Sequence, residues 1–170
     1  KAFYEGPIAA SIVSAVSHPP TNPGVTVIPG DISMADLKDY EARVRQPIRS
    51  TYRGYEILGM PTPSSGGIAI AQALNLMETF DLSGKSRADI EHLYLEASRV
   101  AFADRNAYVA DEEFVDVPKD GLLSKAYARE RARAIGPTAA PGKVAAGDPY
   151  PFENDLSVPL RPLARPLVQE

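Results

Sequence analysis

Two serines and two glycines stand directly before an apolar helical pattern, at Ser64-Ser65-Gly66-Gly67. Hydroxyl groups and unhindered backbone at the start of a helix can hold a carboxylate or an oxyanion. The first N–H groups of a helix have no intrahelical partner, and the helix dipole favours negative charge there. The same residues also suit a helix N-cap whose glycines allow close packing. Since N-caps are common, we favour the cap over a ligand site.

One carboxylate lies where a charge is costly. Asp104 follows Ala97 by seven residues, so both fall on the apolar stripe of one predicted helix. A charge on a buried face destabilises the fold unless it is paired, and the adjacent Arg105 points to another side of the helix. We therefore expect Asp104 to bind a basic residue or backbone N–H groups and to organise the fold rather than to perform chemistry.

The other polar residues indicate neither a metal site nor a cofactor. Residues 111–113 and Asp116 form an acidic cluster that could hold Ca²⁺, but EF-hand spacing is missing and we interpret the cluster as a hydrated turn. His92 is expected on a solvated helix face, and His18 lies in a proline-rich loop. The chain has no cysteine, which excludes thiolate ligands and cysteine nucleophiles. It has no phosphate-loop, dinucleotide, serine-hydrolase or zinc-protease motif.

The elements that must position these residues follow from periodicity. Apolar residues recur at helical spacing from Ile68 to Phe80 and from Arg87 to about Val109, on more than one side of each helix, as in helices packed between layers. Alternation around Arg53-Gly54 predicts a tight β-hairpin. Shorter helices are predicted at Gly6 to Val16, Ser33 to about Tyr40 and Ser124 to Ala134. The fold class is helix-rich α+β with one hairpin, whose strands belong to a larger sheet.

Length and charge bound what the chain can be. Its 170 residues suffice for one domain with a core. A net charge of −4 gives no attraction to nucleic acid, and no apolar run approaches the roughly 20 residues of a membrane span. The stretch 137–170 is rich in proline and poor in aromatic residues. We therefore predict one segment over 1–136 and an extended or disordered tail over 137–170. The alternative is an arm that orders only against a missing partner.

Five motifs agree in order and spacing with one known family over roughly Lys1 to Pro141. They are Phe3–Ala9, Asp36–Tyr40, Tyr52–Tyr55, Met60–Gly67 (MPTPSSGG) and Ala101–Tyr108 (AFADRNAY). The last two form the most specific pair. Together they resemble the gamma-glutamyltransferase (gamma-glutamyltranspeptidase) family, in the C-terminal part of its large subunit.

This resemblance implies a fold and a chemistry. The family fold is the αββα sandwich of the N-terminal-nucleophile hydrolases, whose precursor cleaves itself. The new N-terminal Thr of the small subunit attacks the gamma-glutamyl amide of glutathione or a related donor, with its own α-amine as base. The implied partners are that small subunit and a gamma-glutamyl substrate, without a cofactor, and family habit implies the periplasm or secretion. The matching residues are expected to be architectural, close to the site at best: Ser64, Ser65, Gly66, Gly67, Asp104 and Arg105.

The sequence departs from the family pattern after Lys143. It contains no Thr after Thr138, so we assign no catalytic residue and interpret the chain as a piece of something longer. One hypothesis is an enzyme part, with acylases and poly-gamma-glutamate-cleaving enzymes as close variants. The other is a non-catalytic truncated homologue that acts as a binding or assembly module. One hairpin cannot cover both long helices, so we expect self-association, or binding of a partner segment, through a face lined by Ile70, Leu74 and Met77.

Overall fold

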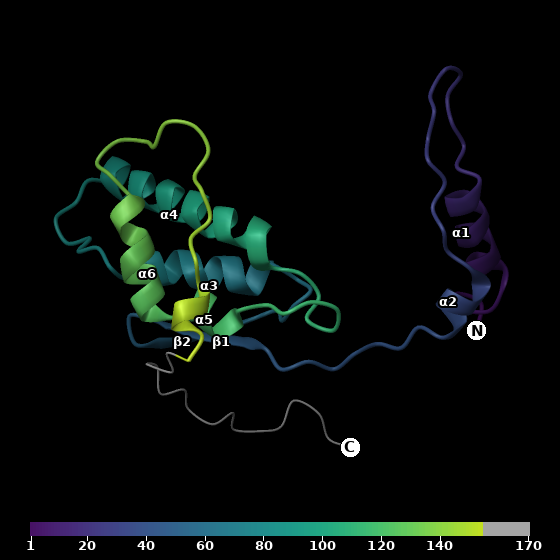
Figure 1. Ribbon diagram of the computed structural model, residues 1–170, viewed down its shortest axis with the longest axis horizontal. Helices are drawn as coiled ribbons and strands as arrows, with labels where there is room; N and C mark the ends of the chain where they lie inside the picture. The colour runs from purple at the N-terminus through teal and green to yellow at the C-terminus, as the bar shows by residue number, and fades with distance from the viewer. Residues whose placement is uncertain (155–170) are drawn as a thin grey trace. The chain divides into compact units, whose positions relative to one another are not determined.

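The computed structural model describes residues 1–154, which fall into two compact units, Lys1–Val44 and the part that begins at Arg45 (Figure 1). The first unit holds helices α1 (Pro7–Ser17) and α2 (Met34–Lys38). A capping box starts α2, because the Ser33 side chain accepts from the backbone of the third helical residue, whose carboxylate accepts from Ser33 N. Both helices confirm the elements predicted at these places.

The second unit begins with the predicted hairpin. Strands β1 (Ile48–Tyr52) and β2 (Tyr55–Gly59) pair antiparallel. Arg53 and Gly54 form the turn, and both have positive φ, 49° and 85°. Turns of this kind match the right-handed twist of the two strands. The Ile48 side chain is buried, so one face of β1 packs against the rest of the unit.

Two long helices build most of the core of the second unit. Helix α3 (Gly66–Met77) lies between the hairpin and helix α4 (Arg87–Tyr108) and packs against both (Figure 1). A capping box formed by Ser86 and Asp89 starts α4. The apolar side chains that these two helices bury are those of Ile68, Ala69, Ala71, Leu76, Met77, Leu93, Ala97, Val100 and Ala101. Both helices therefore confirm the predicted ranges to within three residues.

Two short helices follow where the sequence predicted one. Helix α5 (Lys119–Leu123) precedes helix α6 (Lys125–Arg131), which continues as the 3₁₀-helix η1 (Ala132–Ala134). Ser124 was predicted only as the start of this helix; it is the N-cap of α6, with its Oγ accepting from two backbone N–H groups at 3.1 Å. Helix α5 is a single turn that contains a glycine, so neither periodicity nor propensity indicates it. No helix in the described part of the chain has both the length and the apolar character needed to cross a membrane.

Residues 137–154 are irregular apart from the 3₁₀-helix η2 (Tyr150–Phe152). Pro149 is fully buried, and an ideal Cβ on Gly121 would lie 2.2 Å from Pro149 O. This described part of the tail contacts this chain's own helices. The extended or disordered tail and the arm that orders against a missing partner both stay predictions. Residues 155–170 lie outside the described residues, so the boundary at 136/137 stays a prediction.

Candidate functional site

The turn from Met60 to Gly67 joins β2 to α3, and two glycines make that junction close. An ideal Cβ on Gly67 would lie 2.2 Å from Met60 O, and one on Gly59 would lie 2.7 Å from the Gly67 Cα. These distances leave no room for a side chain at either position, so backbone packs directly on backbone. The close packing predicted for the glycines at the start of α3 is confirmed at Gly67.

The serines of this turn do not cap α3 through their side chains. Ser65 is the N-cap residue, with φ −84° and ψ −13°, and its side chain makes no cap hydrogen bond. N-cap side chains reach the helix amides from extended backbone, whereas the Ser65 backbone is already helical. Ser64 is exposed and Ser65 is partly buried. The turn thus presents two hydroxyl groups at a helix N-terminus, and a place near a catalytic centre stays a prediction.

Replacing Gly67 with alanine is expected to lower the free energy of unfolding by about 1–3 kcal/mol, the usual cost of forcing atoms into packed structure. Gly66→Ala is the matched control. The nearest atom to its ideal Cβ is Ser64 Oγ at 3.9 Å, and alanine is the better helix former. Urea denaturation followed by circular dichroism compares the two variants. Equal midpoints for Gly67→Ala and the wild type would contradict the close contact.

Asp104 is fully buried and binds donors from several elements. Its Oδ2 accepts hydrogen bonds from Gln72 Nε2 of α3 at 2.6 Å and from Tyr127 OH of α6 at 3.0 Å. Arg131 of α6 lies 3.2 Å from Oδ2 through Nε and 3.0 Å from Oδ1 through Nη2. Gly147 N donates to Oδ1 at 2.9 Å. The expected pairing of Asp104 is confirmed, and one carboxylate thereby joins α3, α4, α6 and the irregular segment.

The surroundings of Asp104 keep two phenol groups protonated. Burial raises the pKa of Tyr127, and the adjacent Asp104 carboxylate raises it further. Tyr108 OH donates to Gly147 O at 2.6 Å. Burial also raises the pKa of Tyr108, followed by the charges of Asp148 and Asp104. Both phenols are therefore hydrogen-bond donors at neutral pH and cannot act as bases there.

Arg105 does not take part in this network, as predicted from its position on another side of the helix. Its Nη1 donates to the adjacent Asn106 Oδ1 at 2.8 Å. His92 is partly exposed, and its Nε2 lies 2.8 Å from Gly136 O, a contact that the sequence did not indicate. Asp104 is therefore joined to helix α3, which begins at the Ser64–Gly67 turn, through its hydrogen bond with Gln72. Arg105 makes no such connection among the bonds described here.

A second network of buried and half-buried polar groups was missed by reasoning from the sequence. Lys125 Nζ donates to Thr51 O at 2.6 Å, to Asn75 Oδ1 at 2.6 Å and to Glu78 Oε2 at 2.5 Å. Burial acts to raise the pKa of Glu78, but hydrogen bonds from Lys125 and from Arg53 N outweigh it and hold this pKa below its ordinary value. The available signal was Asn75, one of two amide side chains in a mostly apolar helix.

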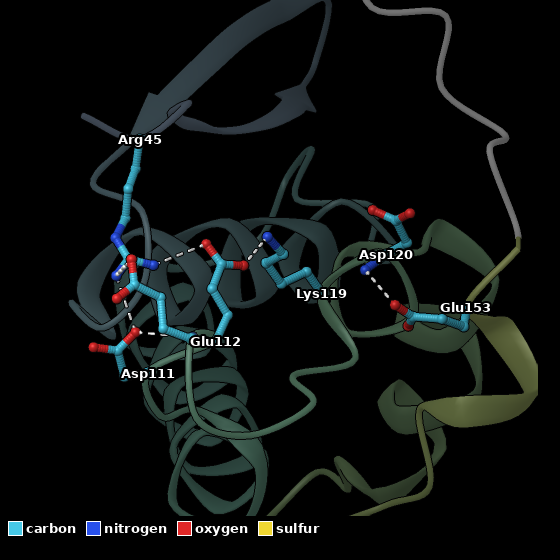
Figure 2. A network of polar contacts seen from close by, with 7 residues as sticks. Arg45, Asp111, Glu112, Lys119, Asp120 and Glu153 are labelled. Carbon is cyan, nitrogen blue, oxygen red and sulfur yellow. Dashed lines mark hydrogen bonds and ion pairs between the residues drawn. The ribbon is translucent and has the colours of Figure 1, made fainter. Parts of the chain in front are cut away.

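The acidic cluster after α4 is ion-paired. Figure 2 shows Arg45 between Asp111 and Glu112, with Nη2 at 3.0 Å from Asp111 Oδ1 and Nη1 at 3.3 Å from Glu112 Oε1. Lys119 binds the other oxygen of Glu112, and this bond lowers the pKa of Glu112 although burial opposes it. Among residues 1–154, no group of three or more potential metal ligands could hold an ion. The acidic cluster thus forms ion pairs with Arg45 and Lys119, whereas a hydrated turn was predicted.

A second buried carboxylate of α4 contacts the irregular segment. Glu96 Oε2 accepts from Ala140 N at 3.2 Å, and Glu96 Oε1 accepts from Arg99 Nη1 at 2.7 Å. Arg99 also donates to Ala140 O at 3.0 Å and to Gly142 O. The Arg99 hydrogen bond lowers the pKa of Glu96; burial opposes this change, and the Ala140 N–H supports it. Glu96 is thus ionised at neutral pH.

The lowered pKa of Glu96 predicts a loss of stability in acid. A carboxyl group whose pKa is lower in the folded state stabilises the fold above its unfolded pKa, and this contribution disappears as the pH falls through the folded pKa. The difference in unfolding free energy between wild type and Glu96→Gln should therefore be constant at neutral pH and shrink below the ordinary value of 4.5. Urea titrations of both proteins at a series of pH values measure it. A difference that grows in acid would contradict the assignment.

Residues 1–156 match the gamma-glutamyltranspeptidase family. The glutathione hydrolase proenzyme of Escherichia coli K12 is 40% identical over 162 residues, covering 90% of this chain and 26% of that protein. Acylase ACY 1 proenzyme of Pseudomonas sp. strain V22 is 50% identical over 108 residues, covering 62% of this chain and 19% of that protein. The crystal structure of Helicobacter pylori gamma-glutamyltranspeptidase is 40% identical with a TM-score of 0.66, over 83% of this chain and 39% of that chain.

These similarities first define the fold class. The chain has the helix-rich α+β fold of N-terminal-nucleophile hydrolases, as the resemblance implied. More specifically, it belongs to the gamma-glutamyltranspeptidase family. It spans about a fifth to a quarter of the length of the two curated relatives named above.

Proposed function

We propose that this chain is part of the large subunit of an enzyme that transfers or hydrolyses gamma-glutamyl groups of glutathione-type donors. The observation that carries the proposal is the family match over residues 1–156, which includes both specific motifs. Two curated relatives named as proenzymes support an arrangement in which a precursor is processed into subunits. The nucleophile in this proposal is the N-terminal Thr of a small subunit, with its own α-amine as the general base.

In this role the chain positions other groups and attacks nothing itself. The contact between Gly59 and Gly67 fixes the start of α3 against the hairpin, and the Asp104 network fixes α3 against α4 and α6. These contacts keep the β1–β2 hairpin at a fixed position relative to the helices. A neighbouring subunit whose reacting atoms must be placed within fractions of an ångström requires such a rigid support.

A chimera tests the enzyme proposal. Residues 1–156 replace the matching part of the Escherichia coli glutathione hydrolase proenzyme, and two readouts are taken. Processing into two subunits on a denaturing gel and release of amine from a gamma-glutamyl anilide are both expected. Asp104→Ala in the chimera should abolish both, and Arg105→Gln is the matched control that should retain them. A folded chimera with neither activity would contradict the proposal and favour the non-catalytic module.

Acylase activity is the second candidate, favoured by one observation. Identity to Acylase ACY 1 is 50%, against 40% for the glutathione hydrolase proenzyme, although over fewer residues. Both reactions pass through an acyl-enzyme and differ in the acyl group removed. The corresponding chimera in Acylase ACY 1 is therefore assayed with an acylated β-lactam amine alongside a gamma-glutamyl anilide. If only one of the two chimeras is processed and active, this segment belongs to the corresponding enzyme type, glutathione hydrolase or acylase.

Several apolar side chains of α3 and α4 are exposed in this chain, as expected for a part of a larger enzyme. Ile70 is 59% exposed, as expected for the predicted face, but Met77 is only 5% exposed because it turns inward to pack in the core. Helix α4 adds Leu95 (60% exposed) and Phe102 (55% exposed), seven residues and thus about two turns apart on one side. In the full enzyme we expect other parts to cover these side chains; in the isolated chain a second copy covers them.

Light scattering on the purified chain is expected to show a mass above the monomer that falls on dilution. Apolar burial contributes about 25 cal/mol per Å², from which the cost of association is subtracted. Replacing both Leu95 and Phe102 with glutamate should shift the mass to the monomer, whereas Glu130→Gln, an exposed position on α6, should leave it unchanged. A monomeric wild type that binds no hydrophobic dye would contradict self-association and favour a self-standing module.

A further inference from the structure

Two carboxylates of α4 hold the irregular segment at two points. We call residues 140–147 the strap. At its first end, Ala140 contacts Glu96 and Arg99, and at its last end, Gly147 contacts Asp104. Each contact pairs a buried carboxylate, which accepts a strap N–H, with an arginine that donates to a strap carbonyl. Every one of these bonds uses the strap's backbone, and the Val144 side chain adds an apolar contact with the core.

The Gly147 contact is the stronger of the two. Besides the bond from Gly147 N to Asp104, Gly147 O accepts from Tyr108 OH at 2.6 Å, and Arg131 Nη2 donates to Ala145 O at 2.7 Å. An ideal Cβ on Gly147 would lie 2.6 Å from an atom of Arg131, so the strap backbone is pressed against α6. Buried Pro149 follows two residues later. Hydrogen bonds to a fully buried carboxylate such as Asp104 are costly to break.

The Ala140 contact is weaker because it lies closer to solvent. The Arg99 side chain is 34% exposed, and an ion pair reached by water contributes little to stability. The residues before it, Pro137 to Ala139, are exposed, and so is Lys143 within the strap. Glu96 is therefore the group on which this end depends.

We propose that the strap is a hinged lid, which opens at the Ala140 contact and pivots at the Gly147 contact. The strap covers one side of α4, where a cavity of about 450 Å³ is lined by Ala103, Asn106 and Ala107 of the helix and by residues 143–146 of the strap. Opening at Ala140 withdraws residues 143–146 and uncovers this side of α4. Glu96 is then a positioning residue for the lid, and Asp104 holds its pivot. This inference does not depend on the proposed enzymatic role.

Amide hydrogen exchange by NMR on the full chain tests the two ends separately. The N–H groups of Ala140 and Gly147 are the reporters. In Glu96→Gln we expect exchange at Ala140 to be about 10- to 100-fold faster, as the loss of a charge-assisted hydrogen bond implies. Exchange at Gly147 should stay at the wild-type rate. Glu91→Gln, which changes an exposed carboxylate of the same helix, is the matched control and should alter neither.

Cleavage by trypsin after Lys143 gives an independent readout of the open lid. It should be at least about tenfold faster in Glu96→Gln, because proteases require an opened segment. Ala140→Pro removes the strap N–H without changing any residue of α4, so it should have the same effect. Two results would overturn the proposal: exchange that rises equally at Ala140 and Gly147 in Glu96→Gln, or cleavage after Lys143 that neither variant accelerates.

Discussion

Replacing Asp104 with alanine is expected to lower the free energy of unfolding of the second unit by about 3–5 kcal/mol, the range found when one partner of a buried ion pair is removed. The variant leaves the Arg131 guanidinium buried without its carboxylate, and it removes the acceptor of Gln72, Tyr127 and Gly147. Domains are typically stable by only about 5–15 kcal/mol, so much of this chain's stability depends on one side chain.

Urea denaturation followed by far-ultraviolet circular dichroism measures this loss. Arg105→Gln is the matched control, since it changes a charge on the same helix whose guanidinium contacts only its neighbour Asn106 among the bonds described above. The control should stay within about 0.5 kcal/mol of the wild type, as surface substitutions usually do. If Asp104→Ala lost no more stability than Arg105→Gln, the Asp104 network would not hold the unit together.

The purified 170-residue chain is expected to release no amine from a gamma-glutamyl anilide. In the proposed mechanism the acyl-enzyme forms on an N-terminal Thr, and this sequence has no Thr after Thr138. Thr138 itself follows Pro137, away from any new N-terminus. The chain alone is therefore expected to show no amine release at all, rather than a reduced rate.

A spectrophotometric assay decides this second prediction, with a heat-treated sample of the same chain as the blank. Addition of a separately expressed small subunit from a relative serves as a positive arm, because restored release would show that the chain is folded and able to associate. Release by the chain alone, above the blank, would overturn the assignment of the nucleophile to another segment.

Features that depend on neighbouring residues were predictable from the sequence. The boundaries of α3 and α4, the hairpin turn at Arg53-Gly54 and the caps at Ser33 and Ser86 follow from periodicity and from hydrogen bonds within three residues. The burial of Asp104 followed from its place on an apolar stripe. In each case the cause lies within one or two helical turns, so the sequence alone displays it.

Features that depend on distant residues were not predictable. The donor Gly147 N lies 43 residues from Asp104, and Lys125 lies 50 residues from Asn75. Proline density suggested a tail without firm contacts after residue 136, but it carries no information about carboxylates on α4 that bind backbone groups. The missing side-chain cap at Ser65 has the same origin, because packing of Gly67 against β2 determines the backbone there.

The two buried amides of α3 have a consequence for its orientation. A helix that is apolar on nearly all sides gains similar burial energy when it is rotated about its axis, so hydrophobic packing alone gives it no single angular setting. Gln72 can bond to Asp104, and Asn75 to Leu123 O at 2.8 Å, at one rotation angle only. Polar groups buried in this way fix register in coiled coils. We infer that Gln72 and Asn75 do the same here: leucine at both positions would keep α3 buried but allow it several angular settings.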